Sequence, residues 1–209
     1  MAGVHAAVST FSHVIEVAGV IAFAVSGFVE ARQKKMDLVG VFTVAFITAF
    51  GGGTLRDILL DRRPLFWVEH PSYPVLIFGL ALLAYPFGRH LRHVVAERAI
   101  LYADALGLGL FSVTGAALAA GENMPMVVCV MMGVITGIFG GVLRDVICNE
   151  IPMVFRHGQL YATCSFLGCW VYLLADWAKL GPTVPIIAGT LVTFMLRVIA
   201  LRFNLTLPK

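Results

Sequence analysis

Two short stretches of this chain place an arginine directly before an aspartate, one helical turn after a pair of glycines. The stretches are Gly52-Gly53-Thr54-Leu55-Arg56-Asp57 and Gly140-Gly141-Val142-Leu143-Arg144-Asp145, 88 positions apart. Both lie inside apolar segments, where a charged side chain is costly and normally faces an opposite charge or water. The motif therefore predicts an internally duplicated membrane protein whose working parts lie at these two positions.

The composition defines the elements that must hold these charges. Hydrophobic residues make up 59% of the chain and charged residues 13%, with a mean hydropathy of +0.90. A soluble domain cannot cover itself with so few charges. The apolar runs are continuous, not alternating, which favours helices over a barrel. We expect seven transmembrane helices, at about residues 13–31, 38–60, 73–88, 101–120, 125–148, 160–176 and 183–201.

The offset of 88 residues extends well beyond the motif. It aligns residues 13–88 with residues 101–176 without a gap, and 17 of the 76 pairs are identical. Each copy holds three expected spans, so the second copy must enter the membrane upside down. We therefore predict an all-α polytopic membrane protein with two inverted three-helix repeats, 13–88 and 101–176. A basic linker at 89–100 joins them, and an additional seventh helix follows at 183–203.

The glycines before each arginine are expected to disturb their helices. Gly51, Gly52 and Gly53 fall within the second span, and Gly140 and Gly141 within the fifth. Each glycine lowers helix propensity by about 1 kcal/mol relative to alanine, which favours a kink or a short unwinding. Close helix packing is the alternative, because small residues also recur every four positions in both spans.

The inverted arrangement predicts partners for the two arginines. It puts Glu16 at the depth of Arg56, and Asp104 at the depth of Arg144, near opposite faces of the membrane. We expect ion pairs Glu16–Arg56 and Asp104–Arg144 at the two ends of a central path. Each arginine could instead extend to the nearby interface, but Asp57 and Asp145 are too short to do so.

Four hydroxyl side chains follow the repeat at greater depth: Ser26, Thr48, Thr114 and Thr136. They are expected to line the path, although a helical hydroxyl can also bond the carbonyl of its own preceding turn. Tyr73 and the tryptophans near span ends are expected to be interfacial anchors. Basic residues are distributed ten to four between the two faces, which places the N-terminus outside and the C-terminus in the cytoplasm.

In its paired motif and its three-plus-three-plus-one span count, the chain resembles a bacterial member of the trimeric intracellular cation (TRIC) channel family. The resemblance implies a homotrimer in the cell's inner membrane, with a pore for K⁺ or another monovalent cation in each protomer, between the repeats. It implies gating near the glycines of the second and fifth spans. The pore and gate residues would be the following: Ser26, Thr48, Gly51, Gly52, Gly53, Arg56, Asp57, Thr114, Thr136, Gly140, Gly141, Arg144 and Asp145.

The same residues bear on function classes other than a channel. Inverted repeats with interrupted helices suit a secondary transporter as well as a channel, and a zwitterion such as glycine would fit the mixed arginine and aspartate chemistry. No nucleophile–base set or metal cluster indicates an enzyme, and no motif indicates a cofactor. The net charge of +3 does not call for a nucleic-acid partner.

Overall fold

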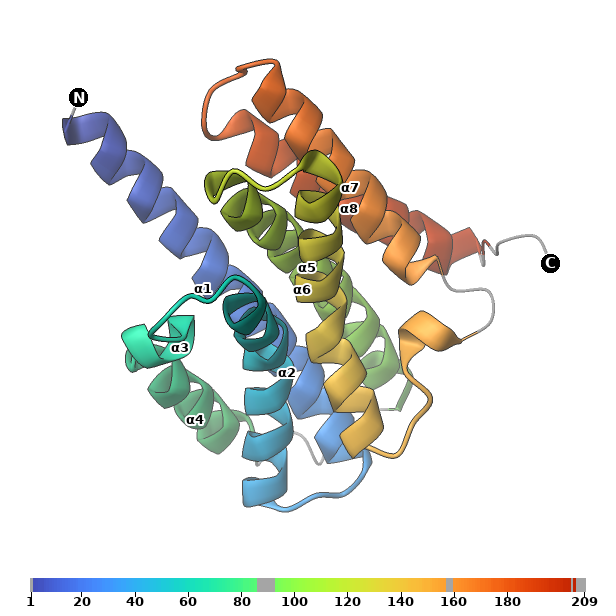
Figure 1. Ribbon diagram of the computed structural model, residues 1–209. Coiled ribbons are helices and arrows are strands. Elements are labelled where there is room, and N and C mark those ends of the chain that lie inside the picture. Colours follow the sequence, from blue (N-terminus) through green and yellow to red (C-terminus); the bar gives the residue numbers. More distant parts are fainter. Residues whose placement is uncertain (1, 86–92, 157–159, 204, 206–209) are drawn as a thin grey trace.

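The computed structural model describes residues 2–85, 93–156, 160–203 and 205, and the linker histidines His90 and His93 fall outside its described side chains. All regular structure in these ranges is helical (Figure 1). The helices are α1 (Ala2–Gln33), α2 (Leu38–Leu59), α3 (Phe66–Glu69), α4 (Ser72–Ala84), α5 (His93–Gly121), α6 (Met126–Ile147), the 3₁₀ helix η2 (Met153–Phe155), α7 (Tyr161–Trp177) and α8 (Val184–Phe203).

Five of the described helices are long and apolar enough to cross a membrane: His13–Gln33 of α1, α2, Arg98–Gly121 of α5, α6 and α8. The third and sixth expected spans are also helical, as α4 and α7, but α4 has 13 residues and α7 has 17. At 1.5 Å per residue these helices span about 20 and 26 Å, less than a hydrocarbon core of about 30 Å. The membrane class is therefore supported, while the number of seven crossings stays a prediction.

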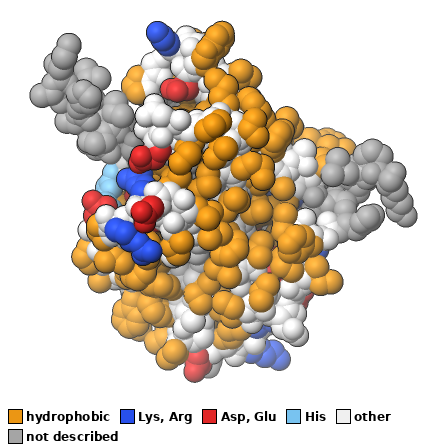
Figure 2. Space-filling model, viewed as in Figure 1, with side chains coloured by type: hydrophobic (Ala, Val, Ile, Leu, Met, Phe, Trp, Pro, Cys, Tyr) orange, Lys and Arg blue, Asp and Glu red, His pale blue; other side chains and the backbone are white. Residues whose placement is uncertain are grey.

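The outer surface of the helix bundle is apolar. Leu82 and Leu83 on α4 are exposed, as are Leu191 and Met195 on α8. Figure 2 shows hydrophobic side chains over most of the visible face, with charged side chains gathered toward its edges. A surface of this kind is suited to lipid and would be costly in water.

The two halves of the chain make reciprocal contacts. Phe23 of α1 stacks on Phe111 of α5 with ring centroids 5.3 Å apart and an interplanar angle of 18°. A Cβ atom at Gly19 would meet the Phe111 ring at 2.9 Å, and one at Gly107 would meet the Phe23 ring at 2.5 Å. Gly19 and Phe23 of the first repeat correspond to Gly107 and Phe111 of the second, so the two contacts are equivalent under the repeat. A twofold axis that relates the two repeats produces this reciprocity.

The crossing of α2 and α6 shows the same relation. A Cβ atom at Gly52 would lie 2.0 Å from the Thr136 carbonyl oxygen, and one at Gly140 would lie 2.3 Å from the Thr48 carbonyl oxygen. Both helices are continuous through their glycines. The expected short unwinding is therefore wrong. The glycines let two backbones touch, and this close packing offsets their low helix propensity.

The turns after the helices also have the same backbone conformation in the two repeats. Lys35 and Asn123, 88 residues apart, have φ angles of 59° and 57°, and Asp61 and Asn149 have φ angles of 51° and 56°. These left-handed residues end the helices that precede them. The duplication seen in the sequence thus extends to the backbone at the ends of α1, α2, α5 and α6.

Helix α8 has no counterpart in the repeats. It packs against α7 and α5, where a Cβ atom at Gly189 would lie 2.9 Å from the Gly168 carbonyl oxygen. Its fully buried Arg197 places its guanidinium carbon 4.7 Å from the centre of the Tyr161 ring. Helix α8 therefore covers the second repeat and contributes a cation to its interior.

Candidate functional site

Each arginine of the repeated motif is held by the aspartate that follows it. Arg56 Nε donates to Asp57 Oδ1 at 2.8 Å, and Arg144 Nε donates to Asp145 Oδ1 at the same distance. The second carboxylate oxygen accepts a backbone N–H where the next short helix begins, from Phe66 of α3 at 2.8 Å and from Met153 of η2 at 2.8 Å. The aspartates thus neutralise the arginines and fix the chain that folds back over them.

The Arg144 site is closed. Arg144 Nη1 lies 2.7 Å from Asp104 Oδ1 and also donates to the Ser26 hydroxyl of α1. Arg144 and Asp104 are fully buried, and the Tyr161 side chain beside them is 2% exposed. A Cβ atom at Gly141 would lie 3.3 Å from Asp104 Oδ1, so a glycine at 141 makes room for the ion pair. Helices α1, α5 and α6 are joined at this point by charge-assisted bonds.

The Arg56 site is looser and faces a cavity. Arg56 Nη2 lies 3.9 Å from Glu16 Oε1, and the Glu16 side chain is 18% exposed. Both ion pairs expected from the inversion are present, but the two distances differ by more than 1 Å. Separations of this size indicate a formed pair at Arg144 and a weaker, partly solvated one at Arg56.

A cavity of about 430 Å³ lies beside Arg56. Its polar lining comes from α1, α2, the chain around α3, and α5: His13, Glu16, Arg56, Asp57, Arg62, Glu69, His70 and Thr114. Three carboxylates and two arginines give this lining a net charge of −1 with neutral histidines. The cavity therefore favours a cation over an anion.

The buried hydroxyls have different roles from one another. Thr48 donates to the Val44 carbonyl and Thr136 to the Met132 carbonyl, each at 2.6 Å and within its own helix. Both are fully buried and press against Gly27 and Gly115. They belong to the helix crossing, whereas Thr114 lines the cavity and Ser26 binds Arg144.

Two side chains of the cavity lining, His13 and His70, and Tyr73 beside them were not expected there. Tyr73, predicted as an interfacial anchor, is 3% exposed, and its hydroxyl lies 3.1 Å from His13 Nδ1 and 3.4 Å from Glu16 Oε2. His70 packs against the His13 ring with centroids 4.8 Å apart. Tyr73 recurs as Tyr161, so the repeat contained a signal for its buried position. The histidines have no such signal.

The face that holds the Arg144 site also carries an exposed ion pair, Lys34–Glu150, between the end of α1 and the loop after α6. The hydrogen bond from Lys34 lowers the pKa of Glu150, and the same bond raises the pKa of Lys34. Both groups are therefore charged at neutral pH. Arg156 adds a second contact to Glu150 at 3.2 Å.

Replacing Glu150 by glutamine should lower the thermal unfolding midpoint slightly at pH 7, because exposed pairs contribute little. A glutamate whose pKa is lowered on folding stabilises the fold above its unfolded pKa, and this stabilisation is lost as the pH falls through the folded value. The difference between wild type and Glu150→Gln should therefore disappear only below the ordinary glutamate pKa of 4.5. A difference that disappears already at pH 6 would contradict this assignment.

Comparison with known proteins agrees with this architecture. A family model described as "Glycine transporter" matches residues 13–89 and residues 101–177. The chain is 35% identical over 195 residues to the UPF0126 inner membrane protein YadS of Escherichia coli K12, covering 93% of each protein. It is 36% identical over 198 residues to a UPF0126 membrane protein of Deinococcus radiodurans, covering 94% of this chain and 90% of that protein.

Solved structures show the same fold. The TRIC trimeric intracellular cation channel orthologue from Rhodobacter sphaeroides matches with a TM-score of 0.88 and 34% identity, over 94% of this chain and all of that one. A prokaryotic TRIC channel crystallised in 0.5 M KCl matches with a TM-score of 0.89 and 30% identity, over 94% and 98% of the two chains.

The helical bundle, the apolar surface and the buried charges define a polytopic membrane protein. The relatives then specify which one: the chain belongs to the TRIC channel family, as a bacterial member related to the UPF0126 membrane proteins. Its structural neighbours are described as cation channels.

Proposed function

We propose that this protein is a K⁺ channel of the inner membrane, with one pore in each protomer of a homotrimer. The pore would run between the inverted repeats, residues 13–88 and 101–176. The description of a structural neighbour as a trimeric intracellular cation channel supports the trimer, and the name of the Escherichia coli relative supports the inner membrane. The distribution of basic residues supports an external N-terminus, which would place the cavity on the outer side.

The observation that carries the proposal is the difference between the two ends of the path. At one end Glu16 and Arg56 line a cavity of about 430 Å³. At the other end Asp104 and Arg144 are fully buried in a tight pair. Ten residues of α1 separate Glu16 from Ser26, which binds Arg144, a distance of about 15 Å along the helix. Phe23 lies between Glu16 and Ser26 on α1. Its stacking partner Phe111 lies between Asp104 and Thr114 on α5.

This arrangement describes a closed channel with access from one side. A cation entering the cavity would meet a lining of net charge −1, since Asp57 neutralises Arg56 at 2.7 Å. Passage would then require the Phe23–Phe111 stack and the Asp104–Arg144 pair to part. The glycine crossing of α2 and α6 has no interlocking side chains at Gly52 and Gly140, which suits it to a sliding motion between the repeats.

A carrier for a small zwitterion is the second candidate, because the matched family model is described as a glycine transporter. One-sided access and an arginine beside a glutamate would also suit a carboxylate and an ammonium group. The cavity of about 430 Å³ is, however, several times larger than such a solute, as expected for a hydrated vestibule.

The two functions are separated by flux assays on the purified protein in liposomes. We expect K⁺ efflux whose rate does not depend on the glycine concentration. Replacing Arg56 by glutamine should change this rate, because the cavity lining then becomes more negative. Gly79→Ala, on the lipid side of α4, serves as the control because a Cβ atom there meets nothing within 4 Å. Saturable glycine uptake without K⁺ flux would support the carrier and contradict the channel.

A further inference from the structure

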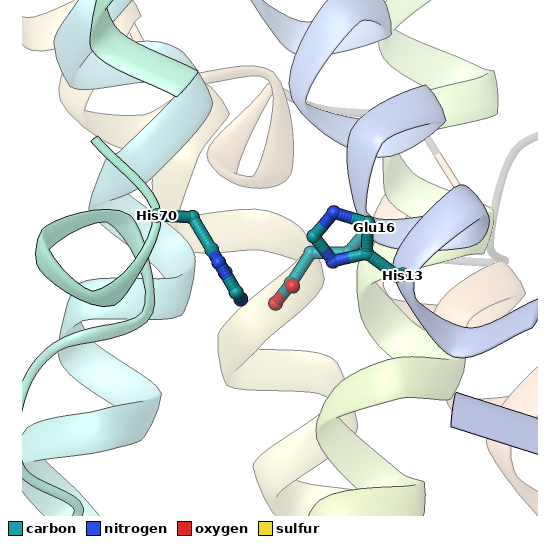
Figure 3. Close-up of side chains that lie close together, drawn as sticks. All are labelled: His13, Glu16 and His70. Atoms are coloured by element: carbon teal, nitrogen blue, oxygen red, sulfur yellow. The ribbon is translucent and has the colours of Figure 1, made fainter. Parts of the chain in front are cut away.

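Three metal-ligating side chains converge at the mouth of the cavity. His13 and Glu16 lie three residues apart on α1, so they share one face of the helix, and His70 directly follows α3. Their ligand atoms all lie within 4.8 Å of one another. Figure 3 shows the three side chains pointing toward a common centre from two separate segments of the chain.

We propose that His13, Glu16 and His70 form a binding site for a divalent transition metal of the zinc type. Two imidazoles and one carboxylate are a ligand set that Zn²⁺ accepts in proteins, with a water molecule or anion in the fourth position. Neutral imidazole also selects transition metals over Mg²⁺ and Ca²⁺, which prefer oxygen ligands. The open cavity beside the three residues gives the metal and its water a route of access.

The distances require only a small adjustment. Tetrahedral zinc with bonds of about 2.1 Å holds its ligand atoms roughly 3.4 Å apart. The ligand atoms must therefore approach by about 1.4 Å at most from their present limit of 4.8 Å. Side-chain rotation can supply this, since His70 follows the short helix α3 and the His13 side chain is exposed. The T-shaped arrangement of the two rings, at 74°, lets both present a nitrogen to one point.

Tyr73 supports the site from the next layer. Its hydroxyl lies 3.1 Å from His13 Nδ1 and 3.4 Å from Glu16 Oε2. The hydroxyl contacts both ligands on α1, so it orients the His13 ring and the Glu16 carboxylate, as hydrogen-bond partners of metal ligands do at established sites. Buried at 3% exposure, Tyr73 is itself held in place by the bundle.

The local charges permit a cation at this position. The nearest competing charge is Arg56, 3.9 Å from Glu16, but Asp57 lies closer to Arg56, at 2.7 Å. Glu69, one residue before His70, also lines the cavity and adds a further negative charge. Arg56 therefore compensates the charge of Glu16 less than that of Asp57, and the Glu16 carboxylate is available to bind a metal.

Metal binding would place two positive charges at the entrance of the cavity. If the protein conducts cations as proposed, the metal should inhibit conduction from this side by electrostatic repulsion and by narrowing the entrance. This consequence rests on the proposed function. The binding site itself does not, because it requires only the three side chains and their positions.

Calorimetric titration of the purified, chelator-treated protein with ZnCl₂ tests the site. We expect one Zn²⁺ per protomer with a dissociation constant on the order of 1–10 μM, and no heat from MgCl₂ at the same concentrations. His13→Gln and His70→Gln should each weaken binding by at least about 100-fold, and Tyr73→Phe by about 10- to 100-fold. The control is the double variant His90→Gln/His93→Gln, which removes the other closely spaced histidine pair and should bind zinc like wild type.

The outcomes decide between the alternatives. Zinc binding that survives in His13→Gln and His70→Gln, or that is lost in the double control, would overturn the assignment, as would wild-type protein that takes up no zinc. Unchanged elution of the variants from a sizing column shows that they are folded. If they are not, X-ray absorption at the zinc edge of the wild-type complex must show two imidazole ligands. A K⁺ flux assay with zinc added then separates the two proposals: bound zinc with no flux at any zinc concentration contradicts the channel and leaves the site intact.

Discussion

Alanine at Gly52 or at Gly140 is expected to destabilise the protein by about 3 kcal/mol or more, the upper part of the range for overpacked cores. The added Cβ atom would lie 2.0 Å from the Thr136 carbonyl oxygen in the first case and 2.3 Å from the Thr48 carbonyl oxygen in the second. Both oxygens belong to the backbone of the facing helix, so no side chain can rotate away. Helices α2 and α6 must separate, and thermal unfolding in detergent would detect the loss.

Two other glycines provide matched controls for this result. Gly79→Ala meets nothing within 4 Å and should be neutral or slightly stabilising, because alanine is the better helix former. Gly51→Ala meets the end of the Leu143 side chain at 2.6 Å, which can move, so its cost should lie between the two extremes. Equal unfolding midpoints for Gly52→Ala, Gly140→Ala and Gly79→Ala would show that α2 and α6 do not cross at these glycines.

Replacing Arg144 by methionine is expected to cost about 3–5 kcal/mol of folding stability, the usual loss when one partner of a buried ion pair is removed. The variant would leave Asp104 and Asp145 buried without their cation, each having lain 2.7 Å from Arg144. The equivalent change at Arg56 should cost clearly less, because Glu16 lies 3.9 Å away and reaches a cavity where water can solvate it. Chemical denaturation of both variants measures the difference.

A second substitution shows whether the loss arises from the ion pair. Asp104→Asn should partly restore the stability of Arg144→Met, since it removes one of the two unpaired charges. The two changes should thus be non-additive, as expected for residues in direct contact. Equal losses for Arg56→Met and Arg144→Met, or additive effects at 104 and 144, would contradict the description of a closed end and an open end.

Much of the fold was predictable because the physical signals are local or periodic. Apolar runs of sufficient length predicted the positions of the long helices. The repeat of 88 residues, which the sequence also shows, recurs in the turns at Lys35 and Asn123. Helices α4 (Ser72–Ala84) and α7 (Tyr161–Trp177) lie where the third and sixth spans were expected.

The charged residues of the site followed from the same symmetry, while their surroundings did not. Inversion paired Glu16 with Arg56 and Asp104 with Arg144. It could not show that one pair is tight and the other open, because a repeat implies equivalence. Helix α8 has no counterpart in the repeats, and its Arg197 packs on Tyr161 beside only the Asp104–Arg144 pair. The glycines were expected to break helices because propensity is local, whereas their contacts with Thr48 and Thr136 join distant segments.

His13 and His70 could not have been joined from the sequence. They are 57 positions apart, neither recurs in the second repeat, and His70 follows a helix of only four residues. The packing of α4 against α1 and of α3 against α2 brings their rings together. Functional residues of this type depend on loop geometry, which hydrophobic periodicity does not encode.

Single-channel recording in planar bilayers under a KCl gradient tests the central proposal most directly. We expect discrete currents that reverse near the K⁺ equilibrium potential, with altered conductance or open probability when Asp104→Asn loosens the closed end. Folded trimers that give no current in the bilayer, together with saturable glycine uptake into liposomes, would contradict a channel and identify a carrier.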